Sequence, residues 1–304
     1  MATITRSTAA NLLVEGIKLN FGTGYKQADK NYLKVFDSMP SNSETEQYQE
    51  TSGFGLHSIK AEGQTSQLQS IAQGPKTYIE NKSYSLRYNV SHEMLSDVKY
   101  QKALTDALDM GKSAANTIET VCMDRLNTAF STNAADLLAD GSALCANNHA
   151  LSGTGGTSSN VGTASALNET SLAAAQVTIT DLKDPAGNRI DVKGQMLVVS
   201  KEDEITAQKL LFSTLTIGNN NNDLNPFARS YGRIPKGYIS SPYLTDENAF
   251  FIRTNIRGMV FQEREKPRIM EDFKNAQMTR ELVSFMRFGV GVYDFRSIYG
   301  NPGQ

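Results

Sequence analysis

A tract of 43 residues, from Ser41 to Ser83, has too few apolar side chains to build a core of its own. Only ten of them are hydrophobic, which is less than a quarter, against 39% for the whole chain. Glycines at positions 53, 55, 63 and 74 interrupt the tract, and Pro75 follows the last of them. We expect a long flap of two strands here. Because an isolated hairpin is only marginally stable in water, such a flap needs another surface to lie on.

The segment that follows the tract has the alternating polarity of a strand with one buried face. Its apolar residues are Tyr84, Leu86, Tyr88 and Val90, and polar residues lie between them. Residues 278–300 predict a second long strand, because eight of the thirteen residues from Glu281 to Tyr293 are hydrophobic. We expect this second strand to return and pair close to residues 84–90.

One long helix is predicted over about residues 97–130. Hydrophobic and small residues recur there at steps of three and four positions, and Asp97 is a suitable N-cap. At ~1.5 Å per residue the helix is about 50 Å long. A compact chain of this length has a diameter of roughly 50 Å, so the helix spans the whole body as a strut.

Two further segments are less regular. Within residues 1–40, Asn11–Phe21 favours a short helix, which we expect the segment GTGYKQ at 22–27 to break. Residues 141–166 are small, polar and rich in glycine, which indicates an exposed loop or a short hairpin.

A separate α/β unit is predicted over residues 168–265. Its first helix, capped by Thr170 or Ser171, has one apolar face made of Leu172, Ala175, Ile179 and Leu182. Residues 195–200 are a continuous apolar run, typical of a strand buried on both faces. A second helix at 201–213 and three strands, at 236–244, 248–254 and 257–265, complete the unit.

Charge and composition exclude several classes of protein. The 304 residues carry a net charge of −2, which provides no electrostatic footprint for nucleic acid or for an anionic membrane. No apolar run approaches the ~20 residues that cross a bilayer, and the N-terminus lacks the apolar region of a signal peptide. Cys122 and Cys145 are too few for a disulfide framework and favour a reducing compartment.

No motif in the chain predicts catalysis. Gly-Lys-Ser at 111–113 is part of a phosphate-loop pattern, but Asp106 stands where that pattern needs its first glycine. The segment lies inside the predicted helix, where Gly111 permits a close approach of another element. Cys145 and His149 supply at most half of a zinc site.

Three close pairs of carboxylates fit solvated faces or ion pairs: Glu44 with Glu46, Glu202 with Glu204, and Glu263 with Glu265. We therefore expect no catalytic residue, no cofactor and no metal ligand. The segment QEREKPR at 262–268 alternates in charge next to Pro267. It fits a solvated strand edge, and it also fits a charged contact between subunits; the sequence leaves both open.

Four segments together resemble one protein family. NLLVEGIKLNFGTGY is similar to its opening helix and Phe-Gly turn, and IENKSYSLRYNVSHEMLSD to its strand before the long helix. SMPSNSETEQYQETSGFG resembles a Pro-Ser-Ser-x-Thr-Glu-x-Tyr stretch, with Pro40, Ser41, Glu46 and Tyr48 in register. DGSALCANNHAL resembles an Asp-Gly-x-x-Leu-Phe-x-x-x-His segment, with His149 at the histidine. The chain thus resembles the Mu-like major head subunit family of tailed bacteriophages, which has the Hong Kong 97-type fold.

The resemblance has departures near the tip of the flap and after the long helix. KAEGQ at 60–64 replaces the family's Glu-Trp-x-Gly turn, and the aromatic residue after Tyr48 is absent. Cys145 stands where the family has Phe. These differences concern the details of the flap tip and not the presence of the flap.

The resemblance implies an α+β fold in four parts. These are an N-terminal arm at 1–40, an extended E-loop at 41–83, a peripheral P domain at 84–167 and 266–304 that contains the spine helix at about 97–130, and an axial A domain at 168–265. It also implies a major capsid protein that forms the hexamers and pentamers of an icosahedral shell around double-stranded DNA. The chain would then be located in the virion, after assembly in the host cytoplasm.

The implied partners are further copies of the chain, with each flap on a neighbouring subunit, together with a scaffolding protein, a head protease and a portal. Two other functions stay open. One is another virion part, such as a tail or decoration protein, although the strut helix and the α/β unit disfavour an all-β tail tube. The other is an α/β enzyme or ligand-binding domain.

Some relatives of this fold join the flap to a neighbour through a Lys–Asn isopeptide bond. The flap lysines here are Lys60, Lys76 and Lys82, and no sequence feature marks one of them as reactive. We predict that assembled particles run on a denaturing gel as a single band at the subunit mass of 33.3 kDa. A ladder of heavier bands would contradict this prediction.

Overall fold

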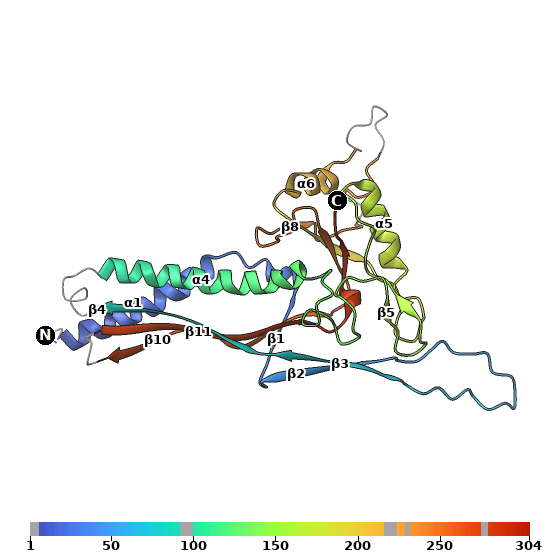
Figure 1. Ribbon diagram of the computed structural model, residues 1–304, viewed down its shortest axis with the longest axis horizontal. Coiled ribbons are helices and arrows are strands. Elements are labelled where there is room, and N and C mark those ends of the chain that lie inside the picture. The colour runs from blue at the N-terminus through green and yellow to red at the C-terminus, as the bar shows by residue number, and fades with distance from the viewer. Residues whose placement is uncertain (1–5, 92–99, 216–223, 229–231, 275–278) are drawn as a thin grey trace.

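The computed structural model describes residues 6–91, 100–215, 224–228, 232–274 and 279–304. It has an elongated body, from which a thin hairpin extends at one end (Figure 1). A smaller unit of helices and strands lies on one side of the body, near the end from which the hairpin leaves (Figure 1).

A four-stranded sheet runs along the body. Its order is β1 (Asp37–Pro40), β10 (Met259–Lys274), β11 (Thr279–Val292) and β4 (Lys82–Ser91). β1 is parallel to β10, and the other pairs are antiparallel. The predicted return of the late strand is confirmed, because β11 pairs with β4 from Thr279 to Phe288.

Helix α4 (Tyr100–Asn127) lies along this sheet and confirms the predicted strut (Figure 1). Its buried face includes Ala107, Ile118 and Cys122, which belong to one core with the strands. Across the sheet, the rings of Tyr84 and Phe288 stack with their centroids 4.4 Å apart. The expected cap Asp97 lies outside the described residues.

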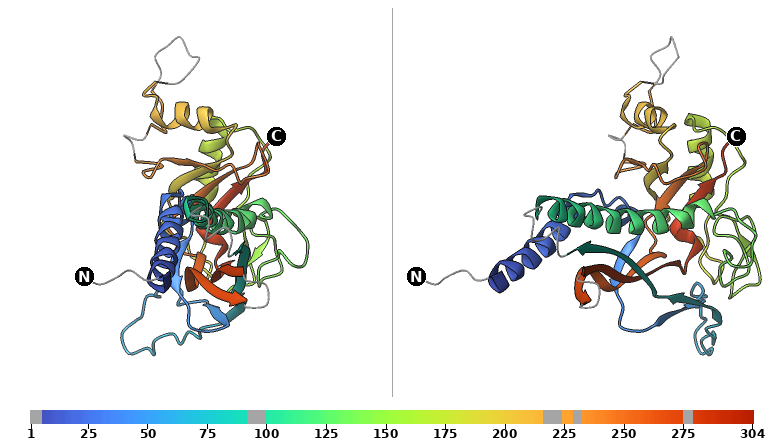
Figure 2. Two further views of the ribbon diagram at one scale, coloured as in Figure 1. Left: turned by 90° about the vertical axis from the view of Figure 1, so that its left-hand side faces the viewer. Right: turned by 60° about the vertical axis from the view of Figure 1, so that its left-hand side comes forward.

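The expectation that GTGYKQ ends the first helix is wrong. Helix α1 (Arg6–Gln27) continues through this segment and packs against α4 (Figure 2). A Cβ on Gly24 would lie 2.0 Å from the carbonyl oxygen of Leu108, and one on Gly111 would lie 2.2 Å from that of Phe21. The glycines are therefore the crossing point of two helix backbones, and the predicted close approach at Gly111 is confirmed.

The short helix α2 (Tyr32–Val35) fixes the end of this N-terminal segment to the body. The backbone N–H of Tyr32 donates to Oε2 of Glu119 on α4 at 3.1 Å. The Tyr32 ring meets the ring of Phe261 edge-on, with the centroids 4.9 Å apart. Burial raises the pKa of Glu119 above its usual range.

The side unit has its own sheet, in the order β12 (Ile298–Asn301), β9 (Phe250–Thr254), β7 (Gly194–Val199) and β8 (Tyr238–Ser240). Helices α5 (Glu169–Thr180) and α6 (Glu204–Phe212) cover it and close a second core. Of the four residues of the predicted apolar face, Leu172, Ala175 and Ile179 lie on α5 and Leu182 follows its end; all four are buried in that core.

The cap of α5 differs from the expectation of Thr170 or Ser171. Asn168 is the N-cap, and its side chain accepts a hydrogen bond from the backbone N–H of Ser171 at 2.7 Å. The Ser171 hydroxyl in turn accepts from the backbone N–H of Asn168 at 2.9 Å. Both expected cap residues lie within the first turn instead.

Two strands belong to other sheets than the sequence suggests. Residues 257–265 are expected in the α/β unit, but β10 runs unbroken across residue 265 and pairs in the long sheet. Residues 266–304 are expected in the body, but β12 pairs with β9 in the side unit. Periodicity identifies a strand, whereas its partner depends on segments that are distant in sequence.

A short hairpin of β5 (His149–Ala150) and β6 (Thr157–Ser158) forms within the glycine-rich segment 141–166, as one of its two expected forms. The 3-10 helix η3 (Phe295–Ser297) connects β11 to β12.

We predict that Gly111→Ala lowers the free energy of unfolding of the subunit by at least about 2 kcal/mol, because the new methyl group overlaps the α1 backbone. The matched control is Gly22→Ala on α1, where a Cβ meets nothing within 4 Å. That substitution raises helix propensity and stabilises by up to about 1 kcal/mol. Denaturant unfolding followed by circular dichroism measures both, and equal effects would refute the crossing-point explanation.

Candidate functional site

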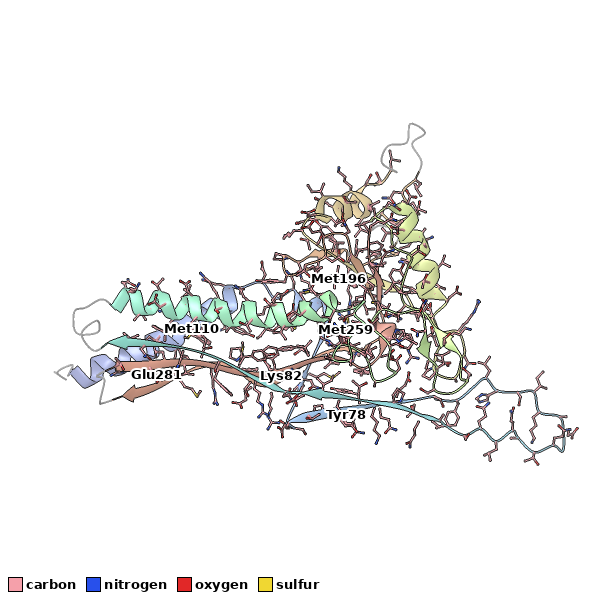
Figure 3. All side chains as sticks on the ribbon, in the orientation of Figure 1. Tyr78, Lys82, Met110, Met196, Met259 and Glu281 are labelled. Carbon is pink, nitrogen blue, oxygen red and sulfur yellow. The ribbon has the colours of Figure 1, made fainter. Side chains whose placement is uncertain are left out.

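The predicted flap is a hairpin of β2 (Thr45–Thr51) and β3 (Gln73–Glu80), paired antiparallel. Residues 53–71 beyond these strands are exposed, except for the half-buried Gly55. The tip carries apolar side chains that no core covers: Ile59 is 102% exposed and Leu68 95%. Figure 3 shows the side chains at this end of the hairpin standing in the open, away from the body. We define residues 53–71 as the flap tip.

We define the root of the flap as the part of β2 and β3 around Tyr48 and Ile79. Apolar contacts hold this root against the body. The Tyr48 ring stacks on that of Tyr293, with centroids 4.7 Å apart and planes 5° apart. The Tyr48 hydroxyl accepts a hydrogen bond from Nε2 of Gln262 at 2.9 Å. On β3, Ile79 packs on Gly291, where a Cβ would lie 2.6 Å from the Ile79 side chain. The root therefore rests on the last residues of β11.

The buried side-chain amide of Asn81 connects the two ends of the flap. Nδ2 of Asn81 donates to Oγ of Ser41 at 2.7 Å and to the carbonyl oxygen of Ser43 at 2.9 Å. The Ser41 hydroxyl lies 2.7 Å from Oε1 of Glu46, and this hydrogen bond lowers the pKa of Glu46. Residues near the two ends of the flap are thus bonded to each other.

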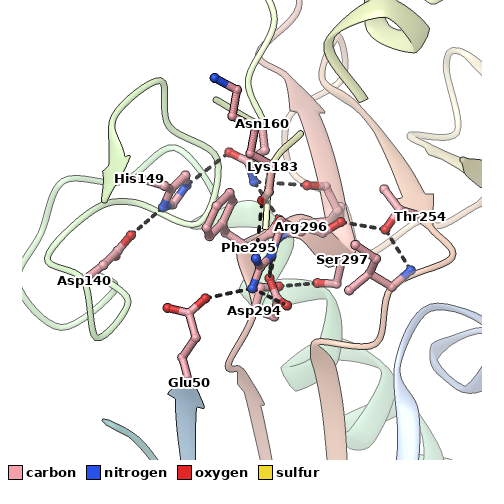
Figure 4. A network of polar contacts seen from close by, with 12 residues as sticks. Glu50, Asp140, His149, Asn160, Lys183, Thr254, Asp294, Phe295, Arg296 and Ser297 are labelled. Atoms are coloured by element: carbon pink, nitrogen blue, oxygen red, sulfur yellow. Dashed lines mark hydrogen bonds and ion pairs between the residues drawn. The ribbon is translucent and has the colours of Figure 1, made fainter. Parts of the chain in front are cut away.

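Beyond the root, Glu50 joins β2 to a buried arginine (Figure 4). Nε and Nη2 of Arg296 donate to the two carboxylate oxygens of Asp294 at 2.8 and 3.0 Å. Nη2 also donates to Oε1 of Glu50 at 2.7 Å, and Oε2 of Glu50 accepts from the Ser152 hydroxyl at 2.8 Å. Burial alone lowers the pKa of Arg296, but its bonds to Asp294 and Glu50 outweigh burial and raise that pKa above its usual value.

A second polar cluster lies beside this one and holds the loop after α4 (Figure 4). Nδ2 of Asn160 lies within hydrogen-bond distance of three backbone carbonyl oxygens, those of Leu144, Phe295 and Ile298. Its Oδ1 accepts from the backbone N–H of Ala146 at 2.9 Å and lies 3.1 Å from Nε2 of His149. The cluster therefore connects the 141–166 segment to η3 and β12.

His149, weighed above as half of a zinc site, has other partners. Its Nδ1 lies 2.6 Å from Oδ2 of Asp140, and its ring stacks on Phe295 at 4.0 Å. Cys145 is buried, which raises the pKa of its thiol. Among the described residues, no three His, Cys, Asp or Glu side chains gather into a group that would hold a metal ion.

The other candidate residues lie apart from one another. Lys112 of the Gly-Lys-Ser segment is on an exposed face of α4, 3.4 Å from Asp109. Glu204 pairs with Lys201 at 3.0 Å, Glu265 with Arg268 at 2.8 Å, and Glu263 with Lys266 at 3.9 Å. Four of the charged residues of 262–268, namely Glu263, Glu265, Lys266 and Arg268, thus pair within the chain. Lys60, Lys76 and Lys82 are exposed along the flap and at its end.

Sequence analysis does not select Arg296, Glu50, Asn160 or Asp294. Of the residues in the two clusters, only His149 is named as a candidate there, and its partner Asp140 is not. A single arginine or glutamate carries no local pattern, so its burial becomes visible only once the fold is known.

Comparison with known proteins identifies the family. Residues 76–301 match the family model described as phage capsid protein. The chain belongs to the phage capsid protein family. Its function is that of a major capsid protein, the subunit of a phage head. No curated protein sequence shows significant similarity to it.

Solved structures of capsid proteins share the fold. The virus-like particle of Pyrococcus furiosus has 11% identity and a TM-score of 0.57, covering 94% of this chain and 98% of that one. The capsid of Myoviridae phage XM1 has 11% identity and a TM-score of 0.55, covering 91% and 92%. A chain of Mycobacterium phage Patience has 12% identity and a TM-score of 0.55, covering 100% and 91%. None of the described helices of this capsid protein has the length and hydropathy of a membrane span.

We predict that Asn160→Asp destabilises the subunit by at least about 3 kcal/mol, because a carboxylate oxygen would replace the donor that faces three carbonyl oxygens. Asn133→Asp is the control, since Asn133 is exposed; it changes stability by less than about 0.5 kcal/mol. Thermal unfolding of the purified variants measures the difference. A tolerated Asn160→Asp would show that the cluster does not hold the loop.

Proposed function

We propose that this capsid protein forms the hexamers and pentamers of an icosahedral head of a tailed bacteriophage, which encloses double-stranded DNA. The observation that carries the proposal is the flap: a hairpin with a fixed root and an apolar tip that its own chain leaves in water. The surface that covers the tip belongs to a second copy of the chain, because the chain is a capsid protein and a capsid shell is built from copies.

The exposed apolar side chains of the tip determine how much free energy each contact with a neighbouring subunit contributes. Covering one fully exposed Ile or Leu side chain contributes about 1.5–3 kcal/mol. Because each subunit both extends a flap and receives one, the contact is heterologous and closes into rings. Each added subunit meets several neighbours at once, so contacts that are individually weak build a stable shell.

In this proposal the parts of the chain take the names of the Hong Kong 97-type fold, and the chain is a Mu-like member. The flap at 41–83 is the E-loop, α4 is the spine helix of the P domain, and the side unit is the A domain. The order of the parts and the resembling sequence segments support these names. Because β10 pairs in the long sheet and β12 in the side unit, we assign β10 to the P domain and β12 to the A domain.

The remaining parts of the proposal rest on the sequence resemblance. They are a scaffolding protein, a head protease and a portal as partners, assembly in the host cytoplasm, and a structural function without catalysis. A net charge of −2 limits repulsion between copies and suits a wall that does not grip the packaged DNA.

We predict that the purified protein forms closed shells or hexameric rings in negative-stain electron microscopy. The double variant Ile59→Ser/Leu68→Ser keeps the unfolding temperature of the subunit, because both side chains are already in water, but it loses most of these particles. Sedimentation velocity measures the assembled fraction at matched concentrations.

The matched control is Ser58→Ala/Ser66→Ala, which changes two exposed polar residues of the same tip and leaves assembly intact. Particles of unchanged yield in the Ile59/Leu68 variant would contradict a docked tip. If the wild type shows no particle under any salt or concentration, coexpression with a scaffolding protein tests whether one is required, and continued absence of shells would contradict the assembly proposal.

A further inference from the structure

We propose that Glu50 is the releasable half of a latch that sets the direction of the flap, with Arg296 and Ser152 as the fixed half. The latch deepens the proposed function and rests on it for its purpose, which is to aim the tip at a neighbour. Its existence is a property of the single subunit and is tested there.

The latch is located at an irregularity of the hairpin. Gln49 lies opposite Lys76, but Thr51 lies opposite Gln73, so β3 has one residue more than β2 between these pairs. Such a bulge bends the strand and redirects side chains. Glu50 is the residue between the two pairs, and it points to the body, where it meets Arg296 and Ser152.

Gly74, in the bulged part of β3, makes room for this contact. A Cβ at Gly74 would lie 2.5 Å from the Ser152 hydroxyl and 2.9 Å from Oε2 of Glu50. The segment 141–166, which carries Ser152, also approaches the flap closely at Gly153, where a Cβ would lie 3.0 Å from that of Ser52. Two glycines therefore allow the flap and the loop to touch at the height of Glu50.

The two halves of the latch differ in what they lose when they separate. Arg296 has a 7% exposed side chain and keeps both bonds to Asp294, so its charge stays paired after Glu50 leaves. Glu50 is at the partly exposed edge of the contact and passes into water, where a carboxylate is well solvated. Opening therefore leaves no buried charge without a partner, which is the costly outcome in such clusters.

The root remains as a pivot when the latch opens. The stack of Tyr48 on Tyr293 and the contact of Ile79 with Gly291 do not involve Glu50. The flap tip extends roughly 30 Å beyond Ser52, at ~3.3 Å per residue, so a rotation of about 10° about the root moves its end by at least about 5 Å. A small change at Glu50 thus becomes a large change at the apolar tip.

Two substitutions break the latch in different ways. Glu50→Ala removes the carboxylate, and Gly74→Ala keeps it but places a methyl group between Glu50 and Ser152. Glu44→Ala removes an exposed carboxylate near the start of the flap and is the control for charge. Glu50→Gln keeps the shape and one acceptor, and we expect it to retain part of the contact.

The measurement is hydrogen exchange of the unassembled subunit, read by mass spectrometry. The reporter is the backbone N–H of Ser52, which donates to the carbonyl oxygen of Ala72 beside the latch. The internal reference is the backbone N–H of Gly162, which donates to the carbonyl oxygen of Gly300. This hydrogen bond joins the segment after β6 to β12. We expect about tenfold faster exchange around Ser52 in Glu50→Ala and Gly74→Ala, with Glu44→Ala and the reference unchanged.

Unchanged exchange around Ser52 in either latch variant overturns the proposal, as does equal acceleration at Ser52 and at the reference. A second readout is the diameter of assembled particles in electron microscopy, where we expect a broader distribution for both latch variants. If the wild type forms no shells at all, the assembly proposal fails while the exchange experiment still decides the latch.

Discussion

Residues 290–301 hold together three parts that are distant in sequence. Gly291 and Tyr293 support the root of the flap, Arg296 binds Glu50, and β12 then enters the sheet of the side unit. Because β11 leads into this segment, the packing of α4 on β4 and β11 also determines where the flap and the side unit lie. The body is therefore a rigid base for a hairpin that has no core of its own.

Much of the fold follows from local pattern. The position of α4 and the two strands β4 and β11 are expected from periodicity, and the structure has them. The predictions fail where the structure of a segment depends on residues that are distant in sequence. Gly24, in a segment whose composition predicts a helix break, lies inside α1 where it crosses α4, and β10 and β12 take partners that their own residues do not specify.

The candidate site divides in the same way. The flap is predictable because its composition excludes a core. The polar clusters at its base are not predictable. Glu50 and Arg296 are 246 positions apart, and each is an ordinary charged residue until the bulge and the end of β11 bring them together. Asn160 likewise becomes a hub only through three carbonyl groups from other segments.

The same separation has a consequence during synthesis. The ribosome makes the flap early, but its contacts Tyr293 and Arg296 are translated more than 200 residues later. Until then the flap has neither its root nor its latch, and β4 lacks the partner that completes the sheet. A nascent chain therefore presents a flap without a fixed direction until its last residues have been made.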